Sequence, residues 1–212
     1  MRDGTSPLAE PTAAARRLRD VYLCRHGQTD YNAEARLQGQ RDIPLNDTGR
    51  EQAKRNGAML RERLGDDIGA YRFVASPLGR AVETMQILRR EMGLAPDDFS
   101  IDARLKELSF GDWEGSTLKE IKLRDPDGHR ARKADKWNFR TPGETGESYA
   151  DLVRRIRPVI DATEPKTILV AHGGIARAVL NAVCGLAEDE AATIGIPQDR
   201  VLTFEDGRAI WV

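Results

Sequence analysis

Residues 21–32 read VYLCRHGQTDYN, and the first four form a short apolar run that predicts a buried parallel strand. The run ends at Arg25, His26 and Gly27, where the glycine is expected to let the backbone turn. In open α/β sheets, ligands bind just beyond the carboxyl ends of the strands. An arginine and a histidine at such a position indicate an anion site that contains a nucleophile or a base.

The same arrangement recurs later in the chain. Residues 167–171 (TILVA) predict a second buried strand, which ends at His172, Gly173 and Gly174. The chain has only three histidines, and two of them occupy these equivalent strand-end positions. This coincidence favours a functional role for both imidazoles.

Strand and helix patterns alternate over most of the chain, which predicts an α/β fold with three layers, α/β/α, around a mostly parallel central sheet. One helix is expected to start at the N-cap Asn46, and another at Ser76 with Pro77 in its first helical position. We expect residues 125–145 to be polar and irregular. Further predicted elements are strands at 73–75, 100–102, 200–204 and 209–212, and helices at 117–124, 148–160 and 175–184.

Length and composition limit the possible classes of protein. With 212 residues and a net charge of -1, the chain can bury a full core and has no global field that would favour nucleic acid or a membrane. Residues 1–18 predict a flexible or weakly helical tail, and residues 19–212 a single domain. No apolar run has the length of a signal peptide or a membrane span, so the cytoplasm is the expected location. Cys24 and Cys184 are expected to be buried free thiols, and no Cys/His spacing predicts a metal site.

Polar side chains at predicted strand ends and helix starts could act together on a phosphoryl group. Such a group needs cationic donors on its non-bridging oxygens, a nucleophile in line and an acid for the leaving oxygen. Arginines can bind it bidentately, a neutral histidine can attack it, and a glutamic acid can protonate the leaving group. Because side chains supply the cations, this chemistry requires no metal and no cofactor. The candidates are Arg25, His26, Asn32, Arg80, Glu107 and His172. Composition alone does not select this set, and the resemblance described next does.

The sequence resembles the histidine phosphatase superfamily, which contains the phosphoglycerate mutases. One Arg-His-Gly would be a weak signal, but six blocks occur here in family order over about residues 20–205. The resemblance implies a phosphoglycerate mutase-like fold in which residues 116–147 form a lid or specificity insertion. The blocks are RHGQT with Asn32, PLNDTG at 44–49, SPLGRA at 76–81, LKE and FGDWEG within 105–115, PG and GES within 142–148, and HGG at 172–174.

The resemblance also implies roles for individual residues. His26 would be the nucleophile that becomes a phosphohistidine, and Glu107 would act first as an acid and then as a base towards water. The side chains of Arg25, Arg80 and His172 would clamp the phosphoryl oxygens. Further residues expected to bind phosphate or substrate are Asn32, Gln38, Gly39 and Gly173.

The same phosphohistidine can serve hydrolysis or transfer to another hydroxyl. The family's cofactor-dependent mutases have a longer insertion between the acid and the second histidine, and they follow the acid with an arginine where this chain has Leu108. FGDWEG is more similar to the family's broad-specificity, ribazole-phosphate and fructose-bisphosphate phosphatases. We therefore predict a metal-independent, histidine acid-type phosphatase of a small phosphorylated metabolite, with a cofactor-dependent phosphoglycerate mutase as the alternative.

Some alternatives stay open at this point. An inactive module that binds a phosphorylated ligand is a second alternative, although such proteins usually lose the nucleophile or the acid, and both are present here. The basic run at 130–140 is either a solvated face or a contact for an acidic substrate. The expected partner is a small phosphorylated substrate, with no nucleic acid and no membrane. The identity of that substrate and the formation of a homodimer are left open.

Overall fold

The computed structural model describes residues 10–212, which fold around a six-stranded sheet with the strand order β3-β2-β4-β1-β5-β6. Strands β1 to β4 are parallel, whereas β5 pairs antiparallel with β1, and β6 antiparallel with β5. The predicted, mostly parallel sheet is confirmed. The strands are β1 (Val21–Arg25), β2 (Arg72–Ala75), β3 (Ser100–Ile101), β4 (Thr167–Ala171), β5 (Val201–Glu205) and β6 (Arg208–Trp211).

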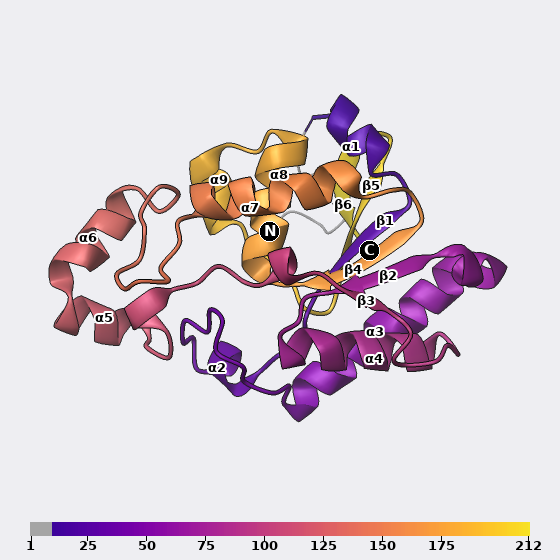
Figure 1. The fold of residues 1–212 in the computed structure, drawn as a ribbon, viewed down its shortest axis with the longest axis horizontal. Helices are drawn as coiled ribbons and strands as arrows, with labels where there is room; N and C mark the ends of the chain where they lie inside the picture. Colours follow the sequence, from indigo (N-terminus) through magenta and orange to yellow (C-terminus); the bar gives the residue numbers. More distant parts are fainter. Residues whose placement is uncertain (1–9) are drawn as a thin grey trace.

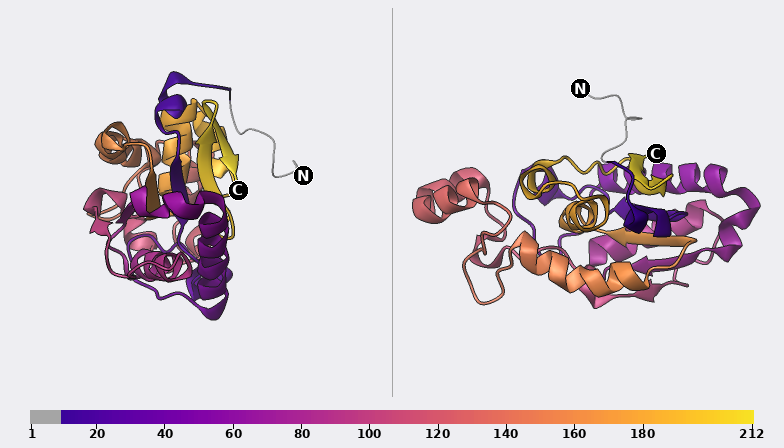
Figure 2. Two further views of the ribbon diagram at one scale, coloured as in Figure 1. Left: turned by 90° about the vertical axis from the view of Figure 1, so that its right-hand side faces the viewer. Right: turned by 90° about the horizontal axis from the view of Figure 1, so that it is seen from above.

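Helices cover both faces of this sheet and give the three predicted layers. The pair α3 and α4 lies on one face, and α7 and α8 lie on the other (Figure 1, Figure 2). The helices are α1 (Ala13–Arg17), α2 (Asp30–Ala33), α3 (Asp47–Leu64), α4 (Gly79–Glu91), α5 (Leu118–Arg124), α6 (Pro126–Ala134), α7 (Tyr149–Ala162), α8 (Gly173–Cys184) and α9 (Glu188–Thr193).

The buried side chains of β1 alternate between two cores because successive residues of a strand face opposite sides of the sheet. Val21 and Leu23 pack with α7 and α8, while Tyr22 and Cys24 pack with α3 and α4. This double burial explains why the strand is a continuous apolar run rather than an alternating one. Both cysteines are buried free thiols, as predicted.

Gly27, directly after the β1–His26 junction, is required by a close approach rather than by a turn. Its φ angle is not in the positive region. A Cβ at this position would lie 2.2 Å from the carbonyl oxygen of Gly49, in the first turn of α3. That helix starts as predicted, because the Asn46 side chain accepts a hydrogen bond from the Gly49 N–H at 3.0 Å. The start of α3 is therefore fixed against the end of β1.

The predicted Ser76 cap of α4 is wrong. The helix begins at Gly79, its N-cap is Leu78, and no side chain caps it. Ser76 is fully buried, and its Oγ lies 2.7 Å from Nε2 of His172. A tertiary partner at the neighbouring strand end has replaced the local capping bond.

The prediction that residues 125–145 are irregular is also wrong over α6. Asp125 accepts a hydrogen bond from the Gly128 N–H at 2.9 Å, and Pro126 occupies the first helical position. Both features are ordinary helix-start signals. Helices α5 and α6 lie apart from the helices that cover the sheet (Figure 1). They fall within the segment 116–147 for which a lid is expected.

Within residues 1–18, predicted to be a flexible or weakly helical tail, residues 13–17 form the short packed helix α1. Thr12 caps α1, and its N–H donates to the Gly207 carbonyl oxygen at 2.9 Å. Ala15 and Leu18 are buried in the same core as α8. The remainder of the predicted tail, residues 1–9, lies outside the described residues.

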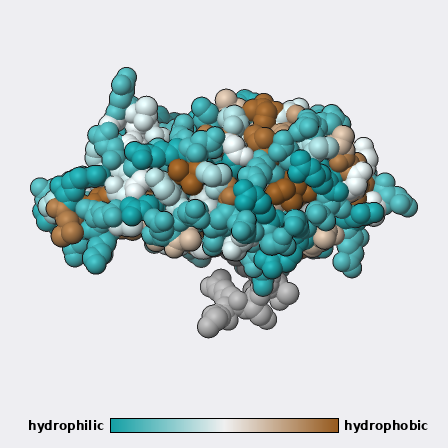
Figure 3. Space-filling model, turned by 90° about the horizontal axis from the view of Figure 1, so that it is seen from below, coloured by the Kyte–Doolittle hydropathy of each residue, from teal (hydrophilic) through white to brown (hydrophobic). Residues whose placement is uncertain are grey.

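The surface is mostly hydrophilic. On the face drawn in Figure 3, hydrophobic residues form small, separate groups. Ile101, Leu118 and Leu123 are the large hydrophobic side chains that are exposed among residues 10–212. Within that range, no helix has the length and apolar character needed to cross a bilayer.

Candidate active site

Two histidines lie at the carboxyl ends of neighbouring parallel strands. β1 and β4 pair in register as far as Arg25 and Ala171, and His26 and His172 follow directly. Both imidazoles are buried, with ring centroids 5.1 Å apart and ring planes inclined by 59°. The two equivalent sequence positions therefore contribute to one site.

The backbone of Gly27 fixes the protonation of His26. Nδ1 lies 2.7 Å from the Gly27 carbonyl oxygen, which only accepts, so Nδ1 carries the proton and Nε2 keeps a lone pair. Arg80 Nε donates to this lone pair at 3.2 Å. Burial, and then the charges of Arg80 and Arg25, hold the pKa of His26 well below its usual value. The ring is therefore neutral near pH 7, the form in which Nε2 can attack.

Ser76 fixes the same tautomer in His172, with the ring proton on Nδ1. Its Oγ accepts from the Leu78 N–H at 3.4 Å and lies 2.7 Å from Nε2 of His172. The hydroxyl proton has no other acceptor among the described residues, so it goes to Nε2, and Nδ1 carries the ring proton. Burial, followed by the charges of Arg80, His26 and Arg25, lowers the pKa of His172 well below normal. His172 is thus a neutral donor through Nδ1.

Two arginines flank the imidazoles. Arg80 is fully buried, and its Nη atoms donate to the carbonyl oxygens of Gly39 and Arg41, both at 2.7 Å. Arg25 Nη1 donates to the Ile196 carbonyl oxygen at 2.7 Å. Burial lowers the pKa of each arginine to about 10, so both guanidinium groups stay charged at neutral pH.

The site contains two donors that nothing satisfies. Arg25 Nε and His172 Nδ1 are the buried side-chain N or O atoms that lack a hydrogen-bond partner among residues 10–212. Leaving a buried donor unpaired costs about 1–3 kcal/mol of folding free energy. Two such donors in one site therefore indicate that a ligand binds there. An oxyanion would accept from both groups. The geometry therefore describes an anion site beside the lone pair of His26.

Glu107 reaches this site from the loop that follows Leu105. The Gly174 N–H, in the first turn of α8, donates to its two carboxylate oxygens at 3.0 and 3.1 Å. The Leu108 N–H donates to Oε1 at 2.8 Å. A Cβ at position 174 would lie 2.2 Å from Oε1, so the glycine makes room for the carboxylate. The charge of Glu107 also favours the protonated forms of Arg25 and Arg80, because it raises the pKa of both arginines.

The sequence model described as histidine phosphatase superfamily (branch 1) matches residues 21–210. The chain belongs to this superfamily. The glucosyl-3-phosphoglycerate phosphatase of Mycolicibacterium vanbaalenii is 35% identical over 191 residues, which cover 84% of this chain and 80% of that protein. A protein of Erwinia tasmaniensis named probable phosphoglycerate mutase is 32% identical over 197 residues, which cover 91% of this chain and 87% of that one.

A solved structure shares the fold. The mycobacterial glucosyl-3-phosphoglycerate phosphatase in complex with VO3 superposes with a TM-score of 0.70 and 30% sequence identity, covering 91% of this chain and 96% of that chain. The resemblance drawn from the sequence blocks is therefore confirmed. The protein is a phosphatase or mutase type of enzyme within the histidine phosphatase superfamily.

The residues expected to bind substrate in this histidine phosphatase occupy different positions. The Gly39 carbonyl oxygen accepts from Arg80, and Gly173 begins α8 beside Arg25. Asn32 Oδ1 accepts from the backbone of Thr29 and from Gln198 Nε2, which also donates to the His26 carbonyl oxygen. Gln198 could not be predicted from the sequence, because nothing near it in the chain indicates a site.

Gln38 has a structural environment. Its Oε1 accepts from the Thr29 hydroxyl at 2.9 Å, and its Nε2 donates to the Ile43 carbonyl oxygen at 3.5 Å. The side chain is buried, and both of its ends bond to the loop between β1 and α3. Both contacts lie within the loop that connects β1 to α3, and the binding of substrate by Gln38 stays a prediction.

A second group of cations lies next to the histidine phosphatase centre. A Cβ at Gly173 would lie 3.5 Å from Arg25 Nε and 3.6 Å from Arg177 Nη1, so the two guanidinium groups are neighbours. Burial, and then the charges of Arg132 and Arg177, lower the pKa of Lys136 to about 8. Arg132 and Lys136 come from the expected lid, and Arg177 comes from the same helix as the HGG block. The basic run is visible in the sequence, whereas Arg177 has no signal of its own there.

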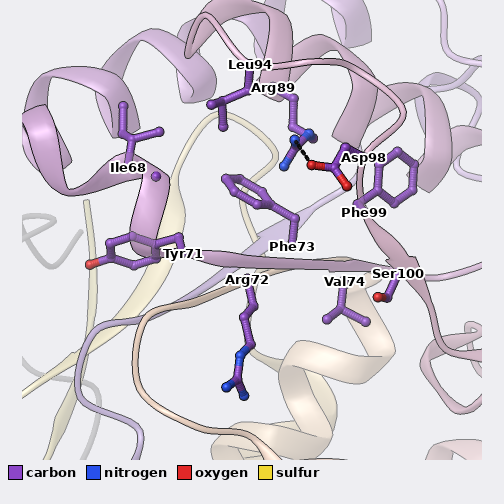
Figure 4. Close-up of a pocket in the computed structure, with 11 residues that line it drawn as sticks. Ile68, Tyr71, Arg72, Phe73, Val74, Arg89, Leu94, Asp98, Phe99 and Ser100 are labelled. Carbon is purple, nitrogen blue, oxygen red and sulfur yellow. Dashed lines mark hydrogen bonds and ion pairs between the residues drawn. The ribbon is translucent and has the colours of Figure 1, made fainter.

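A separate pocket lies near the start of β2 and β3, at the opposite end of the strands from His26. Phe73, Leu94 and Phe99 form much of its wall (Figure 4). The Arg89 guanidinium covers the Phe73 ring at 4.3 Å from its centroid, and its Nη2 lies 3.4 Å from Asp98. The one buried charge here is already engaged by a ring and a carboxylate. This pocket brings no nucleophile and acid together, so the chemistry belongs to the histidine site.

Proposed function

We propose that the protein hydrolyses phosphomonoesters through a phosphohistidine on Nε2 of His26. The observation that carries the proposal is the pair of unpartnered buried donors, Arg25 Nε and His172 Nδ1, beside a neutral imidazole whose Nε2 keeps a lone pair. A phosphoryl group needs this combination of donors and nucleophile. The VO3 complex of the mycobacterial relative supports the proposal, because that protein holds an oxyanion.

The first half of the reaction transfers the phosphoryl group to the enzyme. A phosphoryl oxygen takes over the Arg80 Nε–H that now occupies Nε2 of His26, which frees the lone pair. Nε2 attacks phosphorus in line, the bond from phosphorus to the ester oxygen breaks, and Glu107 in its protonated form gives its proton to that oxygen. The two arginines and the neutral His172 stabilise the charge on the three non-bridging oxygens.

The second half returns the enzyme to its starting state. Glu107, now ionised, takes a proton from a water molecule as that water attacks phosphorus. The nitrogen–phosphorus bond breaks, its electron pair returns to Nε2 of His26, and inorganic phosphate leaves. His26 Nδ1–H donates to the Gly27 carbonyl oxygen throughout the cycle. The imidazole therefore alternates between its free form and the form phosphorylated on Nε2. Because arginines and histidine supply the positive charge and the donors, the cycle needs no metal.

The substrate of this cycle carries a second anionic group. The charges of Arg132 and Arg177 depress the pKa of Lys136, and the charge of Arg177 depresses that of Arg132, so the three cations repel one another. The Arg177 side chain donates to Tyr149 Oη at 3.4 Å and lies beside Arg25 of the phosphate site. A cluster of three cations is costly unless an anion joins it. A small metabolite with a phosphate at one end and a carboxylate or second phosphate at the other fits both clusters.

A phosphoglycerate mutase is the second candidate. It is favoured by the Erwinia relative that is named a probable mutase, and the cation cluster would also hold the carboxylate of phosphoglycerate. Hydrolysis is favoured by the short segment between Glu107 and His172 and by Leu108 after the acid. The presence of both nucleophile and acid argues against an inactive binding module.

Two assays on the purified protein with excess chelator test the proposal. One follows phosphate release from p-nitrophenyl phosphate, and the other the conversion of 3-phosphoglycerate to 2-phosphoglycerate with and without 2,3-bisphosphoglycerate. Metal-independent hydrolysis that His26→Ala abolishes and His129→Ala retains is expected; His129, the third histidine, lies in α6. Rapid mutase turnover with little hydrolysis would replace the proposal by its alternative.

A further inference from the structure

One arginine outside the phosphate site holds the loop that carries Glu107. Arg155 lies in α7, and its Nη1 donates to the carbonyl oxygens of Arg104 and Lys106 at 2.6 and 2.8 Å. Its Nη2 donates to the carbonyl oxygen of Glu107 itself at 3.2 Å. The Arg155 side chain therefore binds three of the four backbone carbonyls of residues 104–107. These residues begin the segment 104–111 that carries Glu107, which is called the acid loop here.

The same guanidinium is anchored from the other side by a carboxylate. Arg155 Nε and Nη2 donate to the two oxygens of Glu147 at 2.9 and 2.8 Å. Glu147 Oε2 in turn accepts from the Ser109 N–H at 2.9 Å. The side chains of this pair are only 22% and 17% exposed, so solvent screens the contact weakly. The backbone is held on both sides of Glu107, by carbonyls before it and an N–H after it.

These contacts complement those at the carboxylate. The Gly174 N–H of α8 fixes the Glu107 side chain, whereas Arg155 fixes its main chain from α7. The loop between Leu105 and Gly111 forms no strand or helix, so these side-chain bonds replace a regular backbone ladder. An acid must lie within hydrogen-bond reach of the leaving oxygen, and a displacement of about 1 Å can cost about 100-fold in rate.

We propose that Arg155, braced by Glu147, is a positioning residue for the general acid Glu107. The inference rests on the proposed phosphohistidine mechanism and extends it to a residue that touches neither substrate nor nucleophile. A lysine cannot replace this arginine, because one ammonium group cannot serve a bidentate carboxylate and three carbonyls from a single planar fork. The charge would survive in Arg155→Lys, but the geometry would not.

The dependence of kcat/KM on the leaving group distinguishes a role of Arg155 in positioning Glu107 from a role in the overall stability of the protein. A poor leaving group such as phenolate needs the proton from Glu107, whereas p-nitrophenolate leaves readily without it. The measured quantity is kcat/KM, which reports the steps up to formation of the phosphohistidine. Arg155→Lys should lower kcat/KM for phenyl phosphate by about 10- to 100-fold, and for p-nitrophenyl phosphate by less than about threefold. Glu107→Gln should show the same selectivity with a larger loss.

Two further variants complete the design. Glu147→Gln removes the negative charge that anchors Arg155, so it should show the same selective loss on phenyl phosphate as Arg155→Lys, but a smaller one. This variant keeps the test valid if an Arg155 variant does not fold. Arg157→Met is the matched control, because Arg157 lies on the same helix, is half exposed and pairs only with Asp161. It should leave both substrates unchanged.

The outcomes distinguish failure of the inference from failure of the mechanism. Equal losses on the two substrates in Arg155→Lys and Glu147→Gln, or no loss at all, would overturn the inference while a selective Glu107→Gln keeps the mechanism. A Glu107→Gln variant without selectivity would remove the acid role itself, and the positioning role with it. Selective losses in all three variants would establish Arg155 as part of the acid apparatus.

Discussion

Replacing Lys136 with glutamine tests whether the segment 116–147, the expected lid, recognises a second anionic group on the substrate. Lys136 lies between α6 and α7, donates to the Ala192 carbonyl oxygen and shares its surroundings with Arg132 and Arg177. The substitution removes one positive charge and keeps a polar side chain. The phosphate donors around His26 are not altered, so a substrate without a second anion should react as before.

The magnitude follows from the single contact that is lost. A hydrogen bond to a charged group contributes about 1.5–3 kcal/mol, which corresponds to a loss of about 10- to 150-fold in kcat/KM. Arg132 and Arg177 remain, so the enzyme should keep part of its preference for substrates with a second anionic group. In the wild-type enzyme, the preference should also fade as the pH rises through about 8, the pKa of Lys136, because the neutral amine no longer attracts an anion. Lys136→Arg should keep the preference above that pH.

Matched pairs of substrates isolate the effect. Glycerol 3-phosphate and 3-phosphoglycerate differ in one terminal group, an alcohol against a carboxylate, and sorbitol 6-phosphate and 6-phosphogluconate repeat the comparison at six carbons. The ratio of kcat/KM within each pair cancels changes that affect the phosphate site. A wild-type ratio near one for both pairs, or a ratio that Lys136→Gln leaves unchanged, would refute the reasoning.

Three further predictions concern the phosphate site. Ser76→Ala leaves Nε2 of His172 unpaired at a cost of about 1–3 kcal/mol, so kcat/KM should fall about 5- to 150-fold, and nitrogen NMR should detect loss of the single Nδ1–H tautomer. Gly174→Ala should displace Glu107 and lower kcat while phosphate inhibits as before, whereas Gly69→Ala, where a Cβ would meet no atom within 4 Å, should have little effect in the same assays. Both site histidines have depressed pKa values, so the unfolded chain binds more protons below about pH 6.5, and the melting temperature should fall as the pH drops from about 6.5 to 5.5.

The site could be predicted from the sequence where its residues directly follow a strand or start a helix. His26 and His172 stand out because each ends an apolar run, and parallel neighbouring strands bring such ends together. Glu107 has no such signal of its own and was found through the resemblance of its loop to a family block. Residues of this kind are predictable because one local feature or one motif fixes their place.

The rest depends on contacts between distant segments. Ser76 has the local features of a helix cap, but its hydroxyl bonds across the sheet to the neighbouring strand end, and no sequence pattern encodes that choice. Arg155 resembles an ordinary helix-surface charge until α7 packs against the acid loop. Arg177 looks equally ordinary until the lid cations approach it. The α6 start at Asp125 and Pro126 carried a local signal that the charged composition of the segment obscured.

The proposed mechanism requires that His26 carries the phosphoryl group during turnover. The most direct test is to quench the enzyme in base while it turns over a phosphomonoester with excess chelator, and to locate the phosphate by mass spectrometry. We expect an acid-labile, base-stable phosphate on Nε2 of His26. It should form at least as fast as the product and be absent in His26→Ala. Turnover without phosphate on His26, or phosphate on any other side chain, would contradict it.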